Sequence, residues 1–444
     1  MTDRSWRPAH KVALAAIMLI GFAVRVAFVA VRQSKVVLQT GDAYWYHHQA
    51  RLVADGRGFL NPFAFFKDGV VAPGADHPPG FVLVLAAADK LGVDSAQGQR
   101  YLMCVLGTLT IGAVALLGRR VAGARVGLIA AAFAALYPNF WINDGMLMVE
   151  TVFMFAMTVA LYFAYGVVQG GGRREVIGMS AGLAAAALVR PEALILYPTL
   201  VLGLVLLRRE QPWRERWVRL GLAALVPIVA FAPWAIYNQG RFERPVPIST
   251  GAGQTLAVGN CDLTYEGAFL GFYNIGCLRE PQIDPPTDTD PSERDASYQR
   301  IARGYIGDNV GDLPRVVAAR VGRLWHVYQI DQGLRLDGYI EGRSGGPPGS
   351  SLVFVRAALW SYYVLVVLAI AGGVVAFRRR IPLSPLVAQV LLATFTAATT
   401  FGVTRYRAGA EIAVVVLAAV AVDGLVTAVH ARSSDQEALV GVQG

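Results

Sequence analysis

The chain has 444 residues, of which 55% are hydrophobic and only 16% are charged, and its mean hydropathy is +0.45. It is more apolar than the roughly 45–50% of a typical soluble domain, which excludes a soluble globular protein and predicts that lipid surrounds most of it. The net charge of +9 could indicate a nucleic-acid partner. The arginines stand in short clusters between apolar runs, however, which is typical of loops that set membrane topology, so we expect no nucleic acid.

Ten stretches are apolar enough to cross a membrane as helices, although three are shorter than the roughly 20 residues that a bilayer requires. In chain order they are residues 12–31, 97–118, 126–137, 151–168, 176–189, 193–207, 220–237, 352–377, 386–403 and 412–429. The first could be a signal peptide, because basic residues precede it. No clear small-residue cleavage site follows its apolar run, so we expect a retained first span.

Positive charge is concentrated in alternate short loops, around residues 119–125, 173–174, 208–219 and 378–380. The loop 138–150 has neither Lys nor Arg. Since cytoplasmic loops carry the excess of positive charge, this pattern predicts a multi-pass protein of the plasma membrane with both termini in the cytoplasm. Residues 32–96 and 238–351 then lie on the extracytoplasmic side.

The predicted fold is an all-α polytopic membrane protein in four parts. Residues 1–237 hold transmembrane helices 1–7 and the outer loop 32–96, residues 238–351 form a sizeable outer loop, residues 352–429 hold helices 8–10, and residues 430–444 form a cytoplasmic tail. Apolar stretches of the first outer loop, such as residues 81–88, are too short to span and predict interfacial helices. No repeat has a fixed period, which disfavours an inverted-repeat transporter.

The three cysteines do not form a zinc framework, because no CxxC or Cys/His pair has ligand spacing. Cys261 and Cys277 both fall on the oxidising side with 15 residues between them. We expect them to form a disulfide, which would stabilise the second outer loop by about 3 kcal/mol. Cys104 lies within the second span and is expected to be a packing residue.

The first outer loop opens with Gly41-Asp42-Ala43-Tyr44-Trp45-Tyr46-His47-His48. Aromatic rings anchor a segment at headgroup depth, so the carboxylate of Asp42 is placed where a base could meet a substrate carried by a lipid. Tyr44 is a candidate for substrate binding. Asp42 could equally be a helix N-cap, because a helical pattern follows it, and the spacing leaves both interpretations open.

The same loop ends in Asp76-His77-Pro78-Pro79-Gly80. Two prolines restrict the backbone and start a helix at a fixed angle, which makes His77 a candidate substrate ligand and an exposed turn the alternative. With His47, His48 and Asp76, His77 could also hold a divalent metal. The spacing is nonspecific, so we assign no metal ligands and leave the cofactor unknown.

Ionisable residues at membrane depth are costly and point to function. Glu150, at the mouth of the fourth predicted span, is therefore a catalytic candidate, ahead of Asp144. Arg190-Pro191-Glu192 separates two short spans, and Arg190 and Glu192 either line the same polar cavity or form a structural ion pair. Arg25, within the first span, either pairs with an acidic residue or extends outward to water.

The last outer turn is Thr404-Arg405-Tyr406-Arg407, followed by Glu411. Arginines on the outer face depart from the charge bias seen elsewhere. Guanidinium groups match phosphate oxygens, so Arg405, Tyr406 and Arg407 are candidate ligands of a polyprenyl-phosphate sugar, with ordinary lipid headgroups as the alternative.

Taken in order, these motifs resemble the bacterial GT-C glycosyltransferases of the protein O-mannosyltransferase and aminoarabinose transferase superfamily (glycosyltransferase family 39-like). The matching segments are Gly41-Asp42 with Tyr44, Asp76 to Gly80, Glu150-Thr151, Arg190-Pro191-Glu192, Pro233-Trp234 with Asn238, Pro247-Ile248-Ser249-Thr250, Gly259-Asn260, and Arg405-Tyr406-Arg407 with Glu411. They extend over nearly the whole chain.

The resemblance implies an inverting transferase that moves a hexose or pentose from a polyprenyl-phosphate donor to a hydroxyl acceptor, which is a glycan, glycolipid or protein. It implies that Asp42 is the general base and that the donor phosphate leaves toward Arg405 or Arg407. Members that mannosylate proteins carry Asp-Glu at this position, whereas this chain has Asp42-Ala43, which weakens the case for a protein acceptor. The alternative classes are a transporter or lipid flippase, which needs a polar path through the full membrane, and a polymer ligase with a larger donor.

Overall fold

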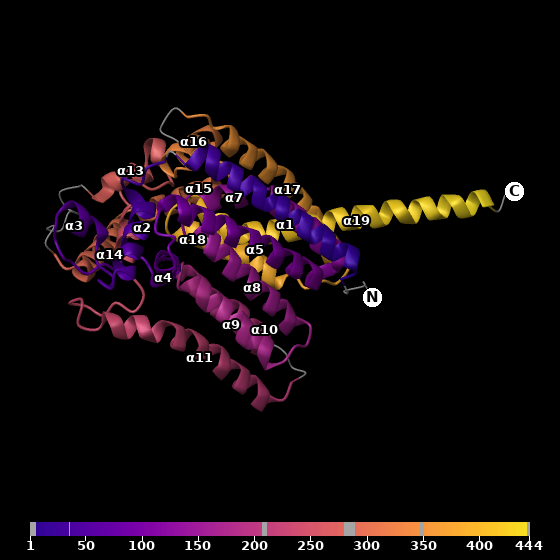
Figure 1. Cartoon of the computed structure of the whole chain (residues 1–444), viewed down its shortest axis with the longest axis horizontal. Helices are drawn as coiled ribbons and strands as arrows, with labels where there is room; N and C mark the ends of the chain where they lie inside the picture. Colours follow the sequence, from indigo (N-terminus) through magenta and orange to yellow (C-terminus); the bar gives the residue numbers. More distant parts are fainter. Residues whose placement is uncertain (1–5, 35, 207–210, 279–288, 346–349, 442–444) are drawn as a thin grey trace.

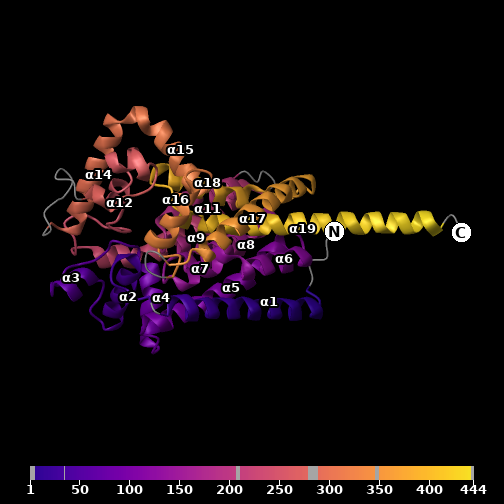
Figure 2. The same cartoon turned by 90° about the horizontal axis from the view of Figure 1, so that it is seen from above.

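The computed structural model describes residues 6–34, 36–206, 211–278, 289–345 and 350–441. These residues form helices and one isolated β-bridge, between Leu60 and Pro73. The long helices run along a common direction, with the chain termini at one end of the bundle and the short helices gathered at the other (Figures 1 and 2). We call the second end the Asp42 end.

Among the described residues, six helices are long and apolar enough to cross a membrane. They are α1 (Pro8–Phe28, continued by η1 Val29–Gln33), α5 (Ala96–Ala122), α8 (Glu150–Val168), α11 (Trp213–Asn238), α17 (Val353–Arg378) and α19 (Ala408–Gly441). A seventh candidate is the pair α6 (Ala124–Leu136) and α7 (Pro138–Gly145), which is bent by 50°. The chain is therefore a multi-pass membrane protein of the predicted all-α class.

The described residues form fewer than the ten predicted spans, although the described part of each predicted range is mostly helical. The ranges that fall short form α9 (Arg173–Ala187), the broken segment η2 (Pro191–Ile195), η3 (Tyr197–Leu202) and α10 (Gly203–Leu206), and α18 (Ser384–Thr399). Two of the breaks occur before prolines: Tyr137 precedes Pro138 and Arg190 precedes Pro191, and both preceding residues have extended backbones. A residue before proline is disfavoured in the helical conformation.

The helices pack through small residues. α19 lies against α17, α6 and α18, and α5 lies between α6 and α8. A Cβ atom at Gly372 of α17 would lie 1.8 Å from the carbonyl oxygen of Leu417 in α19, so only glycine allows this approach. Large apolar side chains remain exposed along α1, α11 and α17, as expected where lipid replaces water.

The Asp42 end consists of two groups of short helices. One group, within residues 32–96, consists of α2 (Gly41–Ala54), α3 (Pro62–Lys67) and α4 (Pro79–Lys90), and α4 contains the predicted helix 81–88. The second group of short helices consists of α12 (Ala252–Ala257), α13 (Asp262–Tyr265), η4 (Gly267–Phe269), η5 (Ile275–Leu278), α14 (Pro291–Asp308), η6 (Val310–Asp312), α15 (Leu313–Leu324), α16 (Ile330–Arg335) and η7 (Leu336–Ile340). Cys261 and Cys277 are joined by a disulfide within it, and Cys104 is buried in α5.

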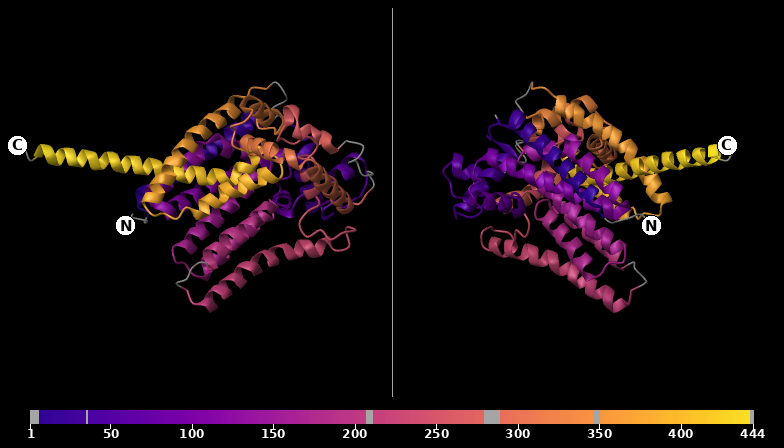
Figure 3. Two further views of the ribbon diagram at one scale, coloured as in Figure 1. Left: turned by 180° about the vertical axis from the view of Figure 1, so that it is seen from behind. Right: turned by 45° about the vertical axis from the view of Figure 1, so that its right-hand side comes forward.

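The last helix differs from its predicted end. α19 continues to Gly441 and projects beyond the bundle, as Figure 3 shows, whereas a tail was predicted from residue 430. Residues 430–440 are polar at first but contain neither Pro nor Gly, so nothing in their local preference ends a helix.

Candidate functional site

Asp42 lies in the first turn of α2, where the helix dipole favours a negative charge. The N-cap of α2 is Thr40, so the N-cap alternative for Asp42 is wrong. The Asp42 carboxylate instead faces two side chains from distant segments. Its Oδ2 lies 3.4 Å from Nη1 of Arg405, and its Oδ1 lies 3.8 Å from Nε2 of His77.

The environment of Asp42 keeps its carboxyl ionised. Burial raises its pKa, but the charges of His77 and Arg405 oppose burial and leave the pKa below its ordinary value of 3.8. The side chain of Asp42 is 40% exposed, so the carboxylate is accessible from outside the protein. An accessible ionised carboxylate can accept a proton from a hydroxyl group.

Arg405 is the centre of the cluster. It belongs to the 3-10 turn η8 (Thr404–Arg407), and its side chain is 15% exposed. In addition to Asp42, its Nη1 lies 3.9 Å from Oε1 of Glu150, and its Nε contacts Oε2 of Glu341. One guanidinium group thus stands among three carboxylates, which keeps it charged and restricts its orientation.

A second ion pair joins this cluster. Nη2 of Arg190 donates to Oε1 of Glu150 at 2.9 Å, and Nη1 lies 3.5 Å from Glu192. Nη1 also donates to the backbone carbonyl of Arg405 at 3.3 Å, and the guanidinium lies 5.2 Å from the ring centre of Tyr406. Arg190 therefore pairs with Glu192 and also contacts the cluster. The Glu150 side chain is only 1% exposed.

His77 is positioned by the turn that starts α4. Pro78 is the N-cap and Pro79 the first helical residue, as the sequence predicted. The backbone N–H of Gly80 donates to the carbonyl of Leu188 at 2.8 Å, and a Cβ atom at Gly80 would lie 2.6 Å from that oxygen. Only glycine allows this approach, which brings the His77 loop against the segment that ends in Arg190.

Two predicted substrate ligands are placed elsewhere. Tyr44 is buried, with its ring stacked on Phe63 at 4.8 Å. Arg407 is buried, donates to Glu411 at 2.6 Å and to the Leu324 carbonyl at 3.0 Å, and lies 3.6 Å from the ring centre of Tyr362. The described contacts of Tyr44 and Arg407 do not include Asp42 or Glu150, so the substrate-binding roles of both stay predictions.

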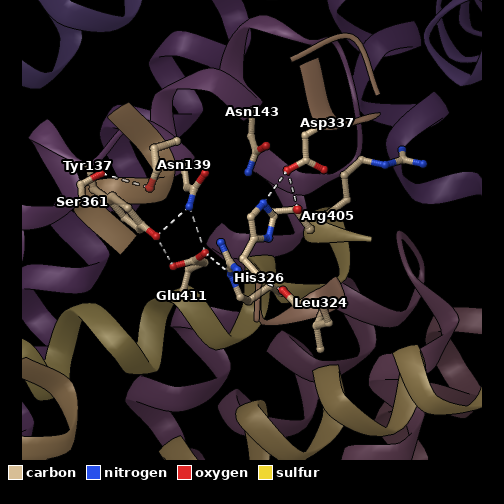
Figure 4. Close-up of polar contacts among 12 residues, drawn as sticks. Tyr137, Asn139, Asn143, Leu324, His326, Asp337, Ser361, Arg405 and Glu411 are labelled. Carbon is tan, nitrogen blue, oxygen red and sulfur yellow. Dashed lines mark hydrogen bonds and ion pairs between the residues drawn. The ribbon is translucent and has the colours of Figure 1, made fainter. Parts of the chain in front are cut away.

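A buried polar network lies beside the cluster (Figure 4). Tyr137 donates to Glu411 at 2.6 Å, and Asn139 donates to both Tyr137 and Glu411. Figure 4 also shows that the side chain of Arg405 points away from the neighbouring pair of His326 and Asp337, whose closest atoms are 3.4 Å apart. Because these buried polar groups hydrogen-bond to one another, their burial costs less free energy than that of unpaired groups.

Other sequence alternatives are decided by the same packing. Nε of Arg25 donates to Oδ2 of Asp144 at 2.6 Å, and both side chains are buried, so Arg25 pairs rather than extending to water. Nδ1 of His47 lies 2.9 Å from the Gln99 amide oxygen. In the described ranges, no group of three or more His, Cys, Asp or Glu could hold a metal ion.

Sequence reasoning missed Glu341 and its neighbour Tyr273, whose hydroxyl donates to Glu341 Oε1 at 2.7 Å. Burial raises the pKa of Glu341, and the charge of Arg405 opposes this rise. The only signal in the sequence is the set of three charged residues Asp337, Glu341 and Arg343 within seven positions, which by itself is typical of a solvated loop.

The fold matches solved membrane glycosyltransferases. The archaeal oligosaccharyltransferase AglB from Archaeoglobus fulgidus, in complex with an inhibitory peptide and a dolichol-phosphate, has a TM-score of 0.58 and 14% identity. The match covers 98% of this chain and 52% of that chain. The apo form of the Archaeoglobus fulgidus oligosaccharyltransferase has a TM-score of 0.58 and 16% identity, over 97% of this chain and 52% of that chain. The chain thus spans about half the length of these structures and shares their fold.

Residues 76–237 match the family model of dolichyl-phosphate-mannose-protein mannosyltransferase. The family resemblance predicted from the sequence is thereby confirmed for this part of the chain. ArnT from Cupriavidus metallidurans bound to undecaprenyl phosphate is similar at 15% identity over 91% of this chain and 77% of that one, with a TM-score of 0.41, too low for a structural argument. No curated protein matches the sequence.

Proposed function

We propose that the protein is an inverting glycosyltransferase that moves a sugar from a polyprenyl phosphate to a hydroxyl acceptor on the extracytoplasmic side of the membrane. The observation that carries this proposal is the meeting of an accessible, ionised Asp42 with the guanidinium of Arg405, 3.4 Å away. A base and a phosphate-binding cation side by side are the two groups that this transfer requires. The family match and the fold support the same reaction class.

In the proposed step, the acceptor oxygen attacks the anomeric carbon of the donor sugar from the face opposite the phosphate. The acceptor hydroxyl gives its proton to Asp42. The bond between the anomeric carbon and the phosphate oxygen breaks, and its electron pair leaves with the polyprenyl phosphate. Arg405 stabilises the negative charge that develops on that phosphate, and attack from the opposite face inverts the configuration.

The remaining residues of the cluster support these two groups. Glu150 is almost fully buried and contacts both Arg190 and Arg405, so we assign it to holding the two guanidinium groups rather than to direct contact with the acceptor. We assign Arg190, Glu192 and Tyr406 to the side of the substrate site that lies next to Arg405. His77, 27% exposed and 3.8 Å from Asp42, is placed to contact the acceptor or to share the transferred proton.

The direction of the Asp42 end follows from the distribution of charge. Arg119 and Arg120 lie in the last turn of α5, and Arg173 and Arg174 are the first residues of α9, at the bundle end opposite to the Asp42 end. If the loops at that end are cytoplasmic, as the positive-inside rule predicts, the site faces outward and takes a donor from the outer leaflet. The acceptor is then a glycan, glycolipid or protein of the cell envelope.

Mass spectrometry of the lipid that copurifies with the protein tests this proposal. We expect a polyprenyl phosphate or its glycosylated form, and the mass of the headgroup would name the sugar. The purified protein, reconstituted with a synthetic polyprenyl-phosphate sugar, should release polyprenyl phosphate. Movement of the lipid across the bilayer without release of polyprenyl phosphate would overturn the proposal in favour of a flippase.

A further inference from the structure

Glu341 occupies a buried position between Arg405 and Tyr273. Its Oε2 contacts Nε of Arg405, and its Oε1 accepts a hydrogen bond of 2.7 Å from the Tyr273 hydroxyl. Only 2% of the Glu341 side chain is exposed. Oε1 is thus hydrogen-bonded, whereas buried Oε2 contacts Arg405 as an ion pair without a hydrogen bond, and we infer that Glu341 does not itself face a substrate.

The backbone that carries Glu341 is fastened on both sides. Four residues before it, Asp337 accepts a hydrogen bond of 2.6 Å from Thr404, the residue next to Arg405. Two residues after it, Arg343 donates to Asn139 at 2.7 Å and to Asn143 at 2.8 Å, which fastens the segment to α7. A carboxylate held between two buried anchors has one position available, and Arg405 is oriented against it.

This contact determines how Arg405 meets Asp42. The distance of 3.4 Å between Arg405 Nη1 and Asp42 Oδ2 exceeds the roughly 2.7–2.9 Å of a close charge-assisted hydrogen bond. In the described part of the chain, Nη2 of Arg405 has no hydrogen-bond partner. Without Glu341, the guanidinium could turn and close on Asp42 with two hydrogen bonds, which would occupy both the base and the phosphate-binding edge.

We propose that Glu341 is a positioning residue, set by Tyr273, that holds Arg405 by its Nε so that Nη2 stays available to the donor phosphate and Asp42 stays available to the acceptor. This inference rests on the proposed function. It assigns to the segment 337–343 the role of aligning the site rather than of binding either substrate.

The test uses the full chain in detergent with a synthetic polyprenyl-phosphate sugar as donor and undecaprenyl phosphate as a binding probe. Glu341→Gln should raise the donor KM and weaken binding of the probe by about 10-fold, since a charged contact to Arg405 is replaced by a neutral one. Tyr273→Phe, which keeps the carboxylate, should change both in the same direction by a smaller factor. The exposed Glu266, from the same outer segment, supplies the matched control Glu266→Gln.

A double-mutant cycle separates positioning from a general loss of structure. If Glu341 acts through Arg405, Glu341→Gln should have little further effect on probe binding in an Arg405→Ala background. Equal effects of Glu341→Gln in both backgrounds, or an unchanged donor KM in Glu341→Gln and Tyr273→Phe, would overturn the inference. The proposed function would survive that result as long as Asp42→Asn still abolishes transfer, so the two failures are distinguishable.

Discussion

Replacing Asp42 with Asn removes the proposed proton acceptor and one negative charge while it preserves the size of the side chain. Loss of a general base costs about 10²–10⁴-fold in rate, which corresponds to roughly 3–5 kcal/mol in the activation free energy. Stability should change little. The Asp42 side chain is 40% exposed, and Arg405 keeps its contacts with Glu150 and Glu341, so we expect about 1 kcal/mol or less in the free energy of unfolding.

The pH dependence follows from the direction of the pKa shift. Because His77 and Arg405 hold the pKa of Asp42 below 3.8 against the effect of burial, the base remains ionised as the pH falls from neutral toward about 4. The rate of transfer should therefore not fall because of Asp42 protonation between neutral pH and about pH 4. Protonation of Asp42 should inactivate the enzyme only below about pH 4.

The assay measures transfer of a labelled sugar from a polyprenyl-phosphate donor to water or to an added hydroxyl acceptor. Asp55→Asn is the matched control, because Asp55 is the exposed C-cap of the same helix. Undiminished turnover of Asp42→Asn, together with normal turnover of the control, would refute the assignment of the base.

Four further changes test the surrounding structure. Arg190→Ala should lower the free energy of unfolding by about 3–5 kcal/mol, because it removes the hydrogen-bonded partner of buried Glu150 and leaves only the 3.9 Å contact with Arg405, and thermal unfolding measures this. Arg25→Met should destabilise to a similar extent by isolating Asp144, and the double variant Arg25→Met/Asp144→Asn should recover part of the loss. Arg407→Gln should lower the midpoint of thermal unfolding without a selective rise in donor KM; a purely kinetic effect would support Arg407 as a donor ligand. Cys261→Ser should cost about 3 kcal/mol and increase proteolysis within residues 238–351, and unchanged proteolysis would contradict this.

Two arginines that have similar positions in the sequence have different neighbours in the folded protein. Arg405 and Arg407 stand two residues apart and looked alike as phosphate ligands. The 3-10 turn of η8 sends their side chains to different neighbours, so Arg405 contacts Asp42 whereas Arg407 pairs with buried Glu411. Local spacing cannot show this, because the direction of each side chain depends on the tight turn that the packed helices impose.

The membrane class and the positions of helices were determined by the sequence alone. Apolar runs in lipid must satisfy their own backbone hydrogen bonds, so they form helices whatever their neighbours are, and proline ends them at Pro138 and Pro191. The number of full spans was not determined in this way, since residues 193–206 form a broken helix and α9 and α18 are short.

The partners of the charged residues were decided only by the tertiary structure. The contact between Arg405 and Asp42 joins positions 363 residues apart, and that between Arg25 and Asp144 joins positions 119 apart. Composition identifies a buried charge as costly, but it does not identify the group that compensates it. That choice depends on which helix ends pack together, and for this reason Glu341 became visible only in the folded protein.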